Sequence, residues 1–419
     1  MTLIHARAII AIFTRRHLFR WGSAAAAVWN GSSLAAANTN MDPRLKEAVA
    51  KLEYLTGNDK TWTVLDKLKS GAPGLTPDKL REAGLTPETW SFEVTADAPT
   101  GSRIAHPLTR AQGNALDWNG LMHLAERHAV RFLHVCTCCN GPDPFHIDLW
   151  EGVPFREIIW LTNPQEKVRR VYYGSWHPPG VHGFQSSLAL SQVLETPPGD
   201  SPVILAYKRN GQPIPAAHGG PVRMVVPGSY SNKSLKWVQR AVLTNDFKSN
   251  DSDAAEFNND TESLLKTRAR FMNPPAESAA NRPVAITGMA QVGISGLKQV
   301  QYCVRSQEHP PEADDPAWTK ADWKNAEILP PPSNWGGGLP GGKLPPNVLH
   351  FDSTTGLPRE WPLRFTIVHW AAMIPPLPAG NYDLCCRTID NNGIPQPMPR
   401  PLPRTGYNAI HTVTLSITA

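Results

Sequence analysis

Residues 218–228 read His-Gly-Gly-Pro-Val-Arg-Met-Val-Val-Pro-Gly, and this motif is the most informative stretch of the sequence. The segment 203–208, Val-Ile-Leu-Ala-Tyr-Lys, precedes it, and 233–237, Lys-Ser-Leu-Lys-Trp, follows it. A guanidinium can hold a phosphate through two parallel hydrogen bonds, and an imidazole can donate another. Arg223 and His218 are therefore candidates for anion binding, although an isolated pair of this kind is more often a surface histidine and half of an ordinary salt bridge.

A cysteine cluster lies upstream of these residues. Three of the six cysteines fall within 135–141, Val-Cys-Thr-Cys-Cys-Asn-Gly, which invites a soft metal. Zinc is disfavoured because no second ligand pair follows, and attached haem is excluded because Asn140 stands where Cys-x-x-Cys needs a histidine. Thiol-disulfide exchange by Cys136 and Cys139 remains open, as does a structural role for three buried cysteines.

The hydrophobic pattern predicts two regions that differ in secondary structure. Up to about Phe271 strand and helix patterns are mixed, and after Asn273-Pro274-Pro275 they are strands alone. The turn 390–393, Asp-Asn-Asn-Gly, fits a tight connection, and the Pro- and Gly-rich insert 309–347 predicts a surface loop. The main predicted strands are 90–94, 130–136, 284–289, 297–304, 363–370, 382–388 and 410–417, and helices are predicted at 121–127 and twice between Asp42 and about Leu68.

The order of these motifs resembles the molybdopterin-binding domain of sulfite oxidases and related enzymes over about 89–246. The segments that carry the resemblance are the cysteine cluster, 150–156, 187–190, 203–211, 218–228 and 233–237. Four later segments are similar to the family's immunoglobulin-like dimerisation domain: 379–382, 387–390, 396–397 and 406–411. The collinearity of the whole set is more specific than any one piece.

The resemblance implies an α+β chain, in which a mixed α/β sulfite-oxidase-type molybdopterin-binding domain precedes an all-β immunoglobulin-like sandwich. We expect a twin-arginine signal peptide at 1–37, an N-terminal helical segment at 38–85, the molybdopterin-binding oxidoreductase domain at 86–275 and the dimerisation domain at 280–419. A homodimer is implied by the resemblance alone.

The first residues have the pattern of an export signal peptide. Arg15-Arg16 precedes apolar residues, and 35–37, Ala-Ala-Ala, fits a signal-peptidase site. Removing the four arginines before Ala37 lowers the net charge from +5 to +1, so neither nucleic acid nor anionic lipid is an expected partner. No other run approaches the ~20 apolar residues of a membrane span. We expect a periplasmic protein, in which a Cys303–Cys385 bridge is permitted but cannot be deduced.

The resemblance also assigns site residues. It implies that the thiolate of Cys136, or in reserve Cys138, binds molybdenum beside the dithiolene of a single pterin. It assigns His218 and Arg223 to the pterin phosphate. Two further residues match positions that contact pterin or anion, namely Lys233 and Lys236.

The implied activity is oxo transfer that oxidises sulfite or a related sulfur oxyanion, with electrons passed to a separate c-type cytochrome because the chain has no haem motif. Phe184 stands near the family's active-site tyrosine, and the arginine segment that often binds substrate is not evident. His182, Arg169 and Arg170 are candidates to compensate. The alternatives are a molybdoenzyme that reduces a sulfoxide or other oxygenated substrate, and a non-catalytic binding or Cys-x-x-Cys redox protein.

Overall fold

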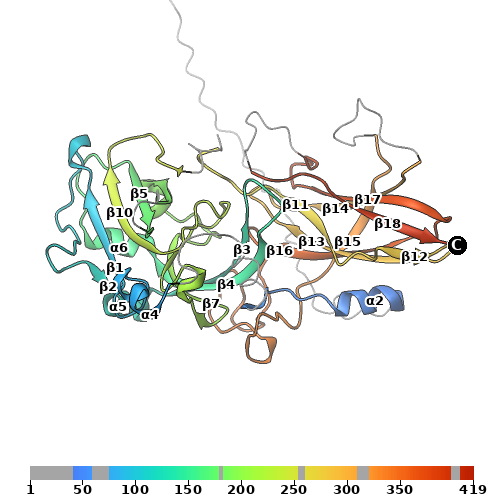
Figure 1. Ribbon diagram of the computed structural model, residues 1–419, viewed down its shortest axis with the longest axis horizontal. Coiled ribbons are helices and arrows are strands. Elements are labelled where there is room, and N and C mark those ends of the chain that lie inside the picture. The colour runs from blue at the N-terminus through green and yellow to red at the C-terminus, as the bar shows by residue number, and fades with distance from the viewer. Residues whose placement is uncertain (1–40, 59–74, 179–182, 253–259, 309–319, 398–405) are drawn as a thin grey trace, which may run out of the picture. The chain divides into compact units, whose positions relative to one another are not determined.

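The structure is a computed structural model that describes residues 41–58, 75–178, 183–252, 260–308, 320–397 and 406–419. Residues 42–419 form one compact unit that is mostly β with few helices (Figure 1). The predicted signal peptide and the second helix expected before Leu68 lie outside the described residues. None of the described helices is both long and apolar enough to cross a bilayer.

Two sheets occupy the first half of the described chain. One has the order β2-β1-β10-β5-β6, with β1 parallel to β10 and the other pairs antiparallel. The other has the order β3-β4-β7-β8, with β9 paired to β7. Their bounds are β1 Ser91–Ala96, β2 Leu116–Asp117, β3 Val130–Thr137, β4 Phe145–Pro154, β5 Arg170–Ser175, β6 Gln185–Ala189, β7 Ile204–Arg209, β8 Gln212–Pro213, β9 Arg223–Val225 and β10 Val238–Thr244.

Short helices surround these sheets. Asp117 starts α5, since its carboxylate accepts a hydrogen bond from the Gly120 amide, and this confirms the helix predicted at 121–127. Buried side chains of both sheets join α5 and α6 in one hydrophobic core. The helices are α2 Pro43–Ala50, α4 Pro77–Glu82, α5 Trp118–His128, α6 Phe155–Leu161 and α7 Leu190–Leu194, with short 3₁₀ turns η1 Ala98–Thr100, η2 Ala216–His218 and η3 Pro340–Gly342.

The hairpin of β3 and β4 has two chemically different faces. Successive strand residues point to opposite sides, and Cys136 pairs with His146 while His134 pairs with Asp148. The other face of the hairpin is apolar and carries Leu133, Val135, Ile147 and Leu149. These side chains pack in one cluster with side chains from residues 335–367. The hairpin therefore has a row of buried polar side chains on one face and an apolar packing surface on the other.

A third sheet contains eight strands in the order β11-β13-β16-β15-β14-β17-β18-β12. Side chains from β11 at one end of this order and from β17 and β18 near the other share one core, so the two halves of the sheet pack against each other. The immunoglobulin-like sandwich stays a prediction. The strands are β11 Arg268–Met272, β12 Glu277–Ala279, β13 Val284–Gln291, β14 Gln299–Ser306, β15 Lys324–Ile328, β16 Ile367–Ile374, β17 Gly380–Ile389 and β18 His411–Thr418.

Two features of this sheet differ from the expectation. β11 precedes the predicted linker at 273–275 and pairs with β13, so the third sheet begins before the predicted start of the all-strand region. β15 lies inside the stretch 309–347, which was predicted to be a surface loop and is in part a strand between β14 and β16. The prediction was wrong for β15 because the strand is polar and largely exposed, which gives it no apolar alternation.

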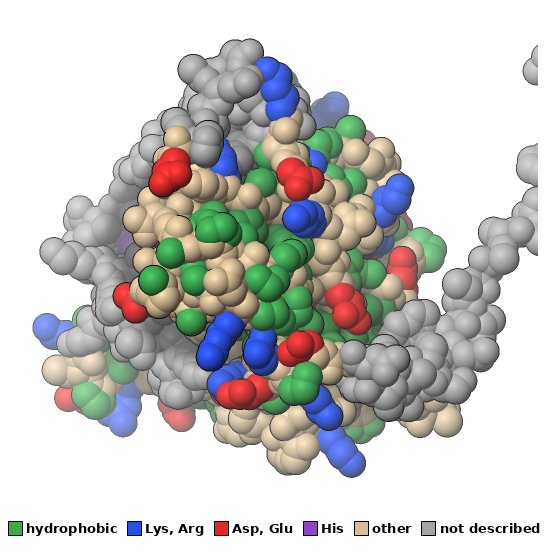
Figure 2. All heavy atoms as spheres, turned by 90° about the vertical axis from the view of Figure 1, so that its right-hand side faces the viewer, with side chains coloured by type: hydrophobic (Ala, Val, Ile, Leu, Met, Phe, Trp, Pro, Cys, Tyr) green, Lys and Arg blue, Asp and Glu red, His purple; other side chains and the backbone are tan. Residues whose placement is uncertain are grey.

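The C-terminal sheet also settles where its cysteines lie. Cys303 and Cys385 are direct partners across β14 and β17, and both are buried free thiols. The turn at 390–393 is confirmed by the bond from the Gly393 amide to the Asp390 carbonyl. Figure 2 looks onto the end of the molecule where β12 and β18 lie, and apolar side chains gather at the centre of that face with charged ones around them.

Candidate active site

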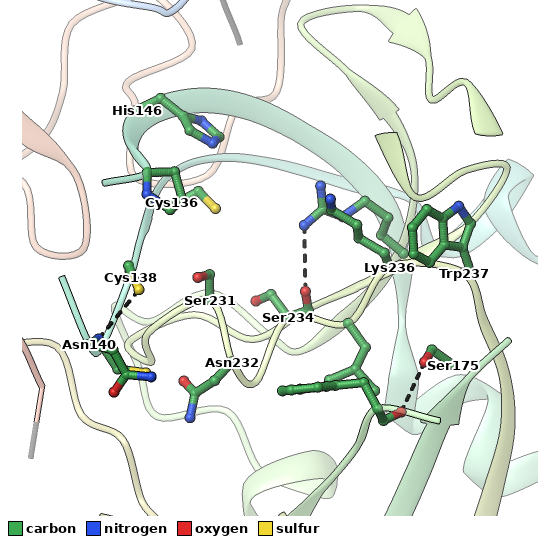
Figure 3. A pocket seen from close by; sticks show the side chains of 15 residues that line it. Cys136, Cys138, Asn140, His146, Ser175, Ser231, Asn232, Ser234, Lys236 and Trp237 are labelled. Carbon is green, nitrogen blue, oxygen red and sulfur yellow. Dashed lines mark hydrogen bonds between the residues drawn. The ribbon is translucent and has the colours of Figure 1, made fainter. Parts of the chain in front are cut away.

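A cavity of about 320 Å³ opens beside the end of β3. Three segments far apart in the sequence line it: the cysteine cluster with His146, the strand end at Ser175 with Phe184, and residues 231, 232 and 234–237 together with Arg223. In Figure 3 Cys136 and His146 lie on one side of this cavity, and Lys236 and Trp237 lie on the other. The sequence motifs that were singled out separately therefore meet in one place.

Behind the Cys136 thiol runs a row of buried charged groups. The His146 ring bonds through Nδ1 to Asp148 Oδ2 at 2.6 Å, and the other carboxylate oxygen, Oδ1, accepts from Arg209 Nε at 2.7 Å. Asp148 is completely buried, and the His146 and Arg209 side chains are nearly so. This carboxylate holds the imidazole in a fixed orientation next to the sulfur.

The row sets the protonation of its members. Burial raises the pKa of Cys136, but His146 and Arg223 outweigh it and hold that pKa below the ordinary thiol value. Burial lowers the pKa of His146, but Asp148 and Cys136 outweigh it and raise that pKa to about 9. Burial raises the pKa of Asp148, but Arg209 and His146 bring it down to about 2. The thiol is thus biased toward a thiolate, the form that binds metals.

Arg223 is the second buried charge at the cavity. It begins β9, and its guanidinium donates to the carbonyls of His218 at 3.2 Å and Ser234 at 3.4 Å and lies 5.2 Å from the Trp150 ring centroid. Among the described residues it forms no ion pair with a carboxylate, and its Nε has no hydrogen-bond acceptor. A buried cation that lies beside the Cys136 thiol and forms no ion pair with a carboxylate among the described residues is well placed to receive an anion.

Glycines explain the form of the 218–228 motif. Gly219 has φ +93°, and a Cβ there would collide with Lys236. A Cβ on Gly220 would collide with the Ile214 carbonyl. The backbone therefore turns through a space that no side chain can occupy, which brings residues 236–237 against the motif.

The other predicted residues divide between cavity and scaffold. Lys236 and Phe184 line the cavity, and the Lys236 ammonium lies 5.4 Å from the Trp237 ring centroid. Cys138 also lines it, and its sulfur accepts from the Asn140 amide at 3.3 Å. His182 lies outside the described residues.

Lys233 is not brought to the cavity. Its ammonium is buried and donates to Asp251 Oδ1 at 2.8 Å and to the Ser187 carbonyl at 3.0 Å, so it belongs to a buried ion pair. The His218 side chain is buried beside the motif and does not line the cavity, although its carbonyl supports Arg223. Arg169 and Arg170 bond to Asn245 and Ser187 and do not line the cavity either.

Sequence reasoning missed His146, Asp148 and Arg209. A signal existed for two of them, because 145–148, Phe-His-Ile-Asp, alternates and directly follows the cysteine loop. A hairpin would place this pair on the Cys136 face. Arg209 carried no such signal, since it reaches Asp148 from 61 positions away.

Comparison with known proteins agrees with this geometry. Residues 86–251 match the model of the oxidoreductase molybdopterin binding domain. The chain is 33% identical over 96 residues to the mitochondrial sulfite oxidase of Drosophila melanogaster and 32% identical over 100 residues to nitrate reductase [NADH] 2 of Phaseolus vulgaris. Residues 86–251 are therefore a molybdopterin-binding oxidoreductase domain, similar in sequence to part of a sulfite oxidase and part of a nitrate reductase.

The sequence matches cover a small part of these relatives. The two alignments span 22% and 23% of this chain, and only 16% and 11% of those relatives. The fold is similar over a longer stretch to the sulfane dehydrogenase SoxCD from Paracoccus pantotrophus, with a TM-score of 0.54, 16% identity and coverage of 80% of this chain and 79% of that one. The fold and the molybdopterin-binding domain with its cofactor follow, while activity and partners are proposals.

Proposed function

We propose that this chain is an exported molybdenum enzyme that oxidises sulfite or a related sulfur oxyanion and passes the electrons to a separate cytochrome. One observation carries the proposal: a thiol with a lowered pKa and a buried guanidinium, both predicted from motifs, line the same cavity in the molybdopterin-binding domain. The arginine pair near the N-terminus supports export.

The lining fits a molybdenum pterin. We assign Cys136 rather than Cys138 as the sulfur ligand, because Cys136 is flanked by His146 and Arg223. Arg223 offers unpaired donor capacity for a phosphate, and Lys236 adds a second positive charge. The bound cofactor supplies two-electron oxygen-atom transfer.

The chain's own residues orient and shield the reacting groups. His146 is held at Nδ1 by Asp148, which fixes its ring against the Cys136 sulfur. Phe184 and Trp237 give the cavity an apolar part of its wall. The Ser175 hydroxyl donates a hydrogen bond of 2.9 Å to the Phe184 carbonyl and so holds the segment that carries Phe184.

A second candidate runs the chemistry in the other direction. Nitrate reductases occur among the matched relatives, and Phe184 removes the hydroxyl expected for sulfite oxidation. Removal of oxygen from an oxyanion or a sulfoxide is therefore the alternative. The homodimer stays a proposal from the family resemblance.

The direction is tested with holoenzyme from a host that makes the cofactor. Sulfite and water should yield sulfate, two protons and two electrons, counted as two equivalents of ferricyanide reduced per sulfate formed. The same enzyme, reduced with dithionite, is offered nitrate or dimethyl sulfoxide. Reoxidation by these compounds without any sulfite-dependent ferricyanide reduction would replace the oxidase proposal with the reductase. A Cys136→Ser variant controls for reaction without the assembled site.

A further inference from the structure

The cysteine loop, residues 138–144, connects β3 to β4 and carries two of the three clustered cysteines. Its two ends are joined by the bond from the Cys138 amide to the Pro144 carbonyl at 3.1 Å. Thr137, just before the loop, is completely buried and adjoins Cys136. Whatever fixes Thr137 and this loop also fixes the direction in which the Cys136 sulfur points.

The groups that hold this loop come from the C-terminal sheet. Arg268 of β11 donates through one nitrogen to Thr137 Oγ1 at 2.7 Å and to the Pro142 carbonyl at 3.0 Å. Arg270, two residues later, pairs with Asp143 at 2.9 Å. Strand β11 therefore contacts two loop residues, Pro142 and Asp143, and Thr137 directly before the loop.

The Arg268 side chain is also enclosed by aromatic rings. Its guanidinium carbon lies 4.4 Å from the centroid of Phe145, the first residue of β4, and 5.0 Å from that of Tyr407. The Tyr407 carbonyl accepts from Tyr230 at 3.0 Å, which ties this ring to the molybdopterin-binding domain. Two C-terminal segments, β11 and residue 407, thus close on the same loop.

The energetics argue against incidental packing. Arg268 is only 4% exposed, and among the described residues no carboxylate forms an ion pair with it and its Nε has no acceptor. Burial lowers the pKa of this guanidinium to about 10, so it still carries its charge near neutral pH. A buried cation without a counterion is costly, and an apolar side chain of similar size would fill the space at lower cost. What an apolar residue cannot supply is the pair of hydrogen bonds to the loop.

We propose that Arg268 is a positioning residue for the molybdenum ligand: it pins Thr137 and Pro142, and so makes the C-terminal sheet a structural part of the cofactor site. The inference rests on the proposed function, since it assumes that the Cys136 sulfur must be aimed. It assigns the C-terminal sheet a role beyond association between subunits.

The test measures the loop directly in cofactor-free protein, so that it does not depend on the identity of the substrate. N-ethylmaleimide labelling is followed cysteine by cysteine with peptide mass spectrometry in wild type, Arg268→Met and Arg268→Lys. Arg282→Met is the control, because Arg282 is an exposed arginine two residues before β13, at the end of that strand opposite the one that pairs with Arg268. Cys303, buried in that sheet, reports unfolding of the sheet in every sample.

Loss of the two bonds should speed labelling of Cys136, Cys138 and Cys139 about tenfold in Arg268→Met, with Cys303 unchanged. Arg268→Lys, which keeps a donor and the charge, should recover part of the protection. In the holoenzyme the Met variant should show a broadened Mo(V) electron paramagnetic resonance signal. Unchanged labelling of the loop in Arg268→Met, or equal acceleration of Cys303, overturns the proposal. If labelling responds as expected while sulfite fails as substrate, only the proposed function fails.

Discussion

Replacing Arg223 with methionine should give a folded protein that retains less than about a tenth of the wild-type molybdenum and pterin. The guanidinium is buried, forms no ion pair with a carboxylate among the described residues and lines the cavity beside Cys136. Two charge-assisted hydrogen bonds to a phosphate contribute roughly 1.5–3 kcal/mol each, so their loss weakens binding by on the order of a hundredfold or more. Elemental analysis and fluorescence of the oxidised pterin measure the outcome.

Two variants make this result interpretable. Arg223→Lys keeps the charge but loses the fork of donors, so an intermediate cofactor content is expected. Arg110→Met removes a partly exposed arginine paired with Glu93 and should leave the content unchanged. Full molybdenum in Arg223→Met would show that the phosphate lies elsewhere.

Replacing Asp148 with asparagine should destabilise the cofactor-free protein by about 3–5 kcal/mol, because it removes the carboxylate that lies between two buried cationic groups. The measurement is urea unfolding followed by tryptophan fluorescence. Asp78→Asn is the matched control: that carboxylate is exposed and pairs with Arg81 on the surface, so its loss should cost below about 1 kcal/mol.

The size of the Asp148 effect should depend on pH with a defined sign. Asp148 has a lowered pKa of about 2, so its contribution is present above its unfolded value of ~3.9 and is lost as pH falls through 2. His146 has a raised pKa of about 9, so its contribution is full below ~6.5 and is lost as pH rises through 9. The stability gap between wild type and Asp148→Asn should therefore be widest between about pH 4 and 6.5 and should narrow above 9. A gap that stays constant from pH 5 to 10 would contradict the account.

Local patterns in the sequence were sufficient for much of the fold. The alternation of residues 130–136 predicted β3, and the patterns at 284–289, 382–388 and 410–417 predicted β13, β17 and β18. The strand expected at 363–370 begins later, at Ile367, because Phe365 has φ +64°, a left-handed conformation that interrupts an extended strand. β15 was missed because an exposed polar strand pairs through its backbone and leaves no apolar signature.

The site was predictable where one motif carries both chemistry and position. Cys136, Arg223 and Lys236 line one cavity, as their order along the chain implied. Lys233 fits the same motif, but the turn at 231–234 directs its side chain to Asp251 and away from the cavity. Arg268 could not be predicted, since its contact with Thr137 joins positions 131 residues apart.

The most direct test of the account is X-ray absorption at the molybdenum edge of wild type, Cys136→Ser and Cys138→Ser, together with molybdenum content. We expect one fewer sulfur ligand in Cys136→Ser alone, with Cys138→Ser identical to wild type. Loss of a sulfur ligand in Cys138→Ser alone, or in neither variant, would contradict the assignment of Cys136 as the metal ligand and with it the role given to the row of His146, Asp148 and Arg209.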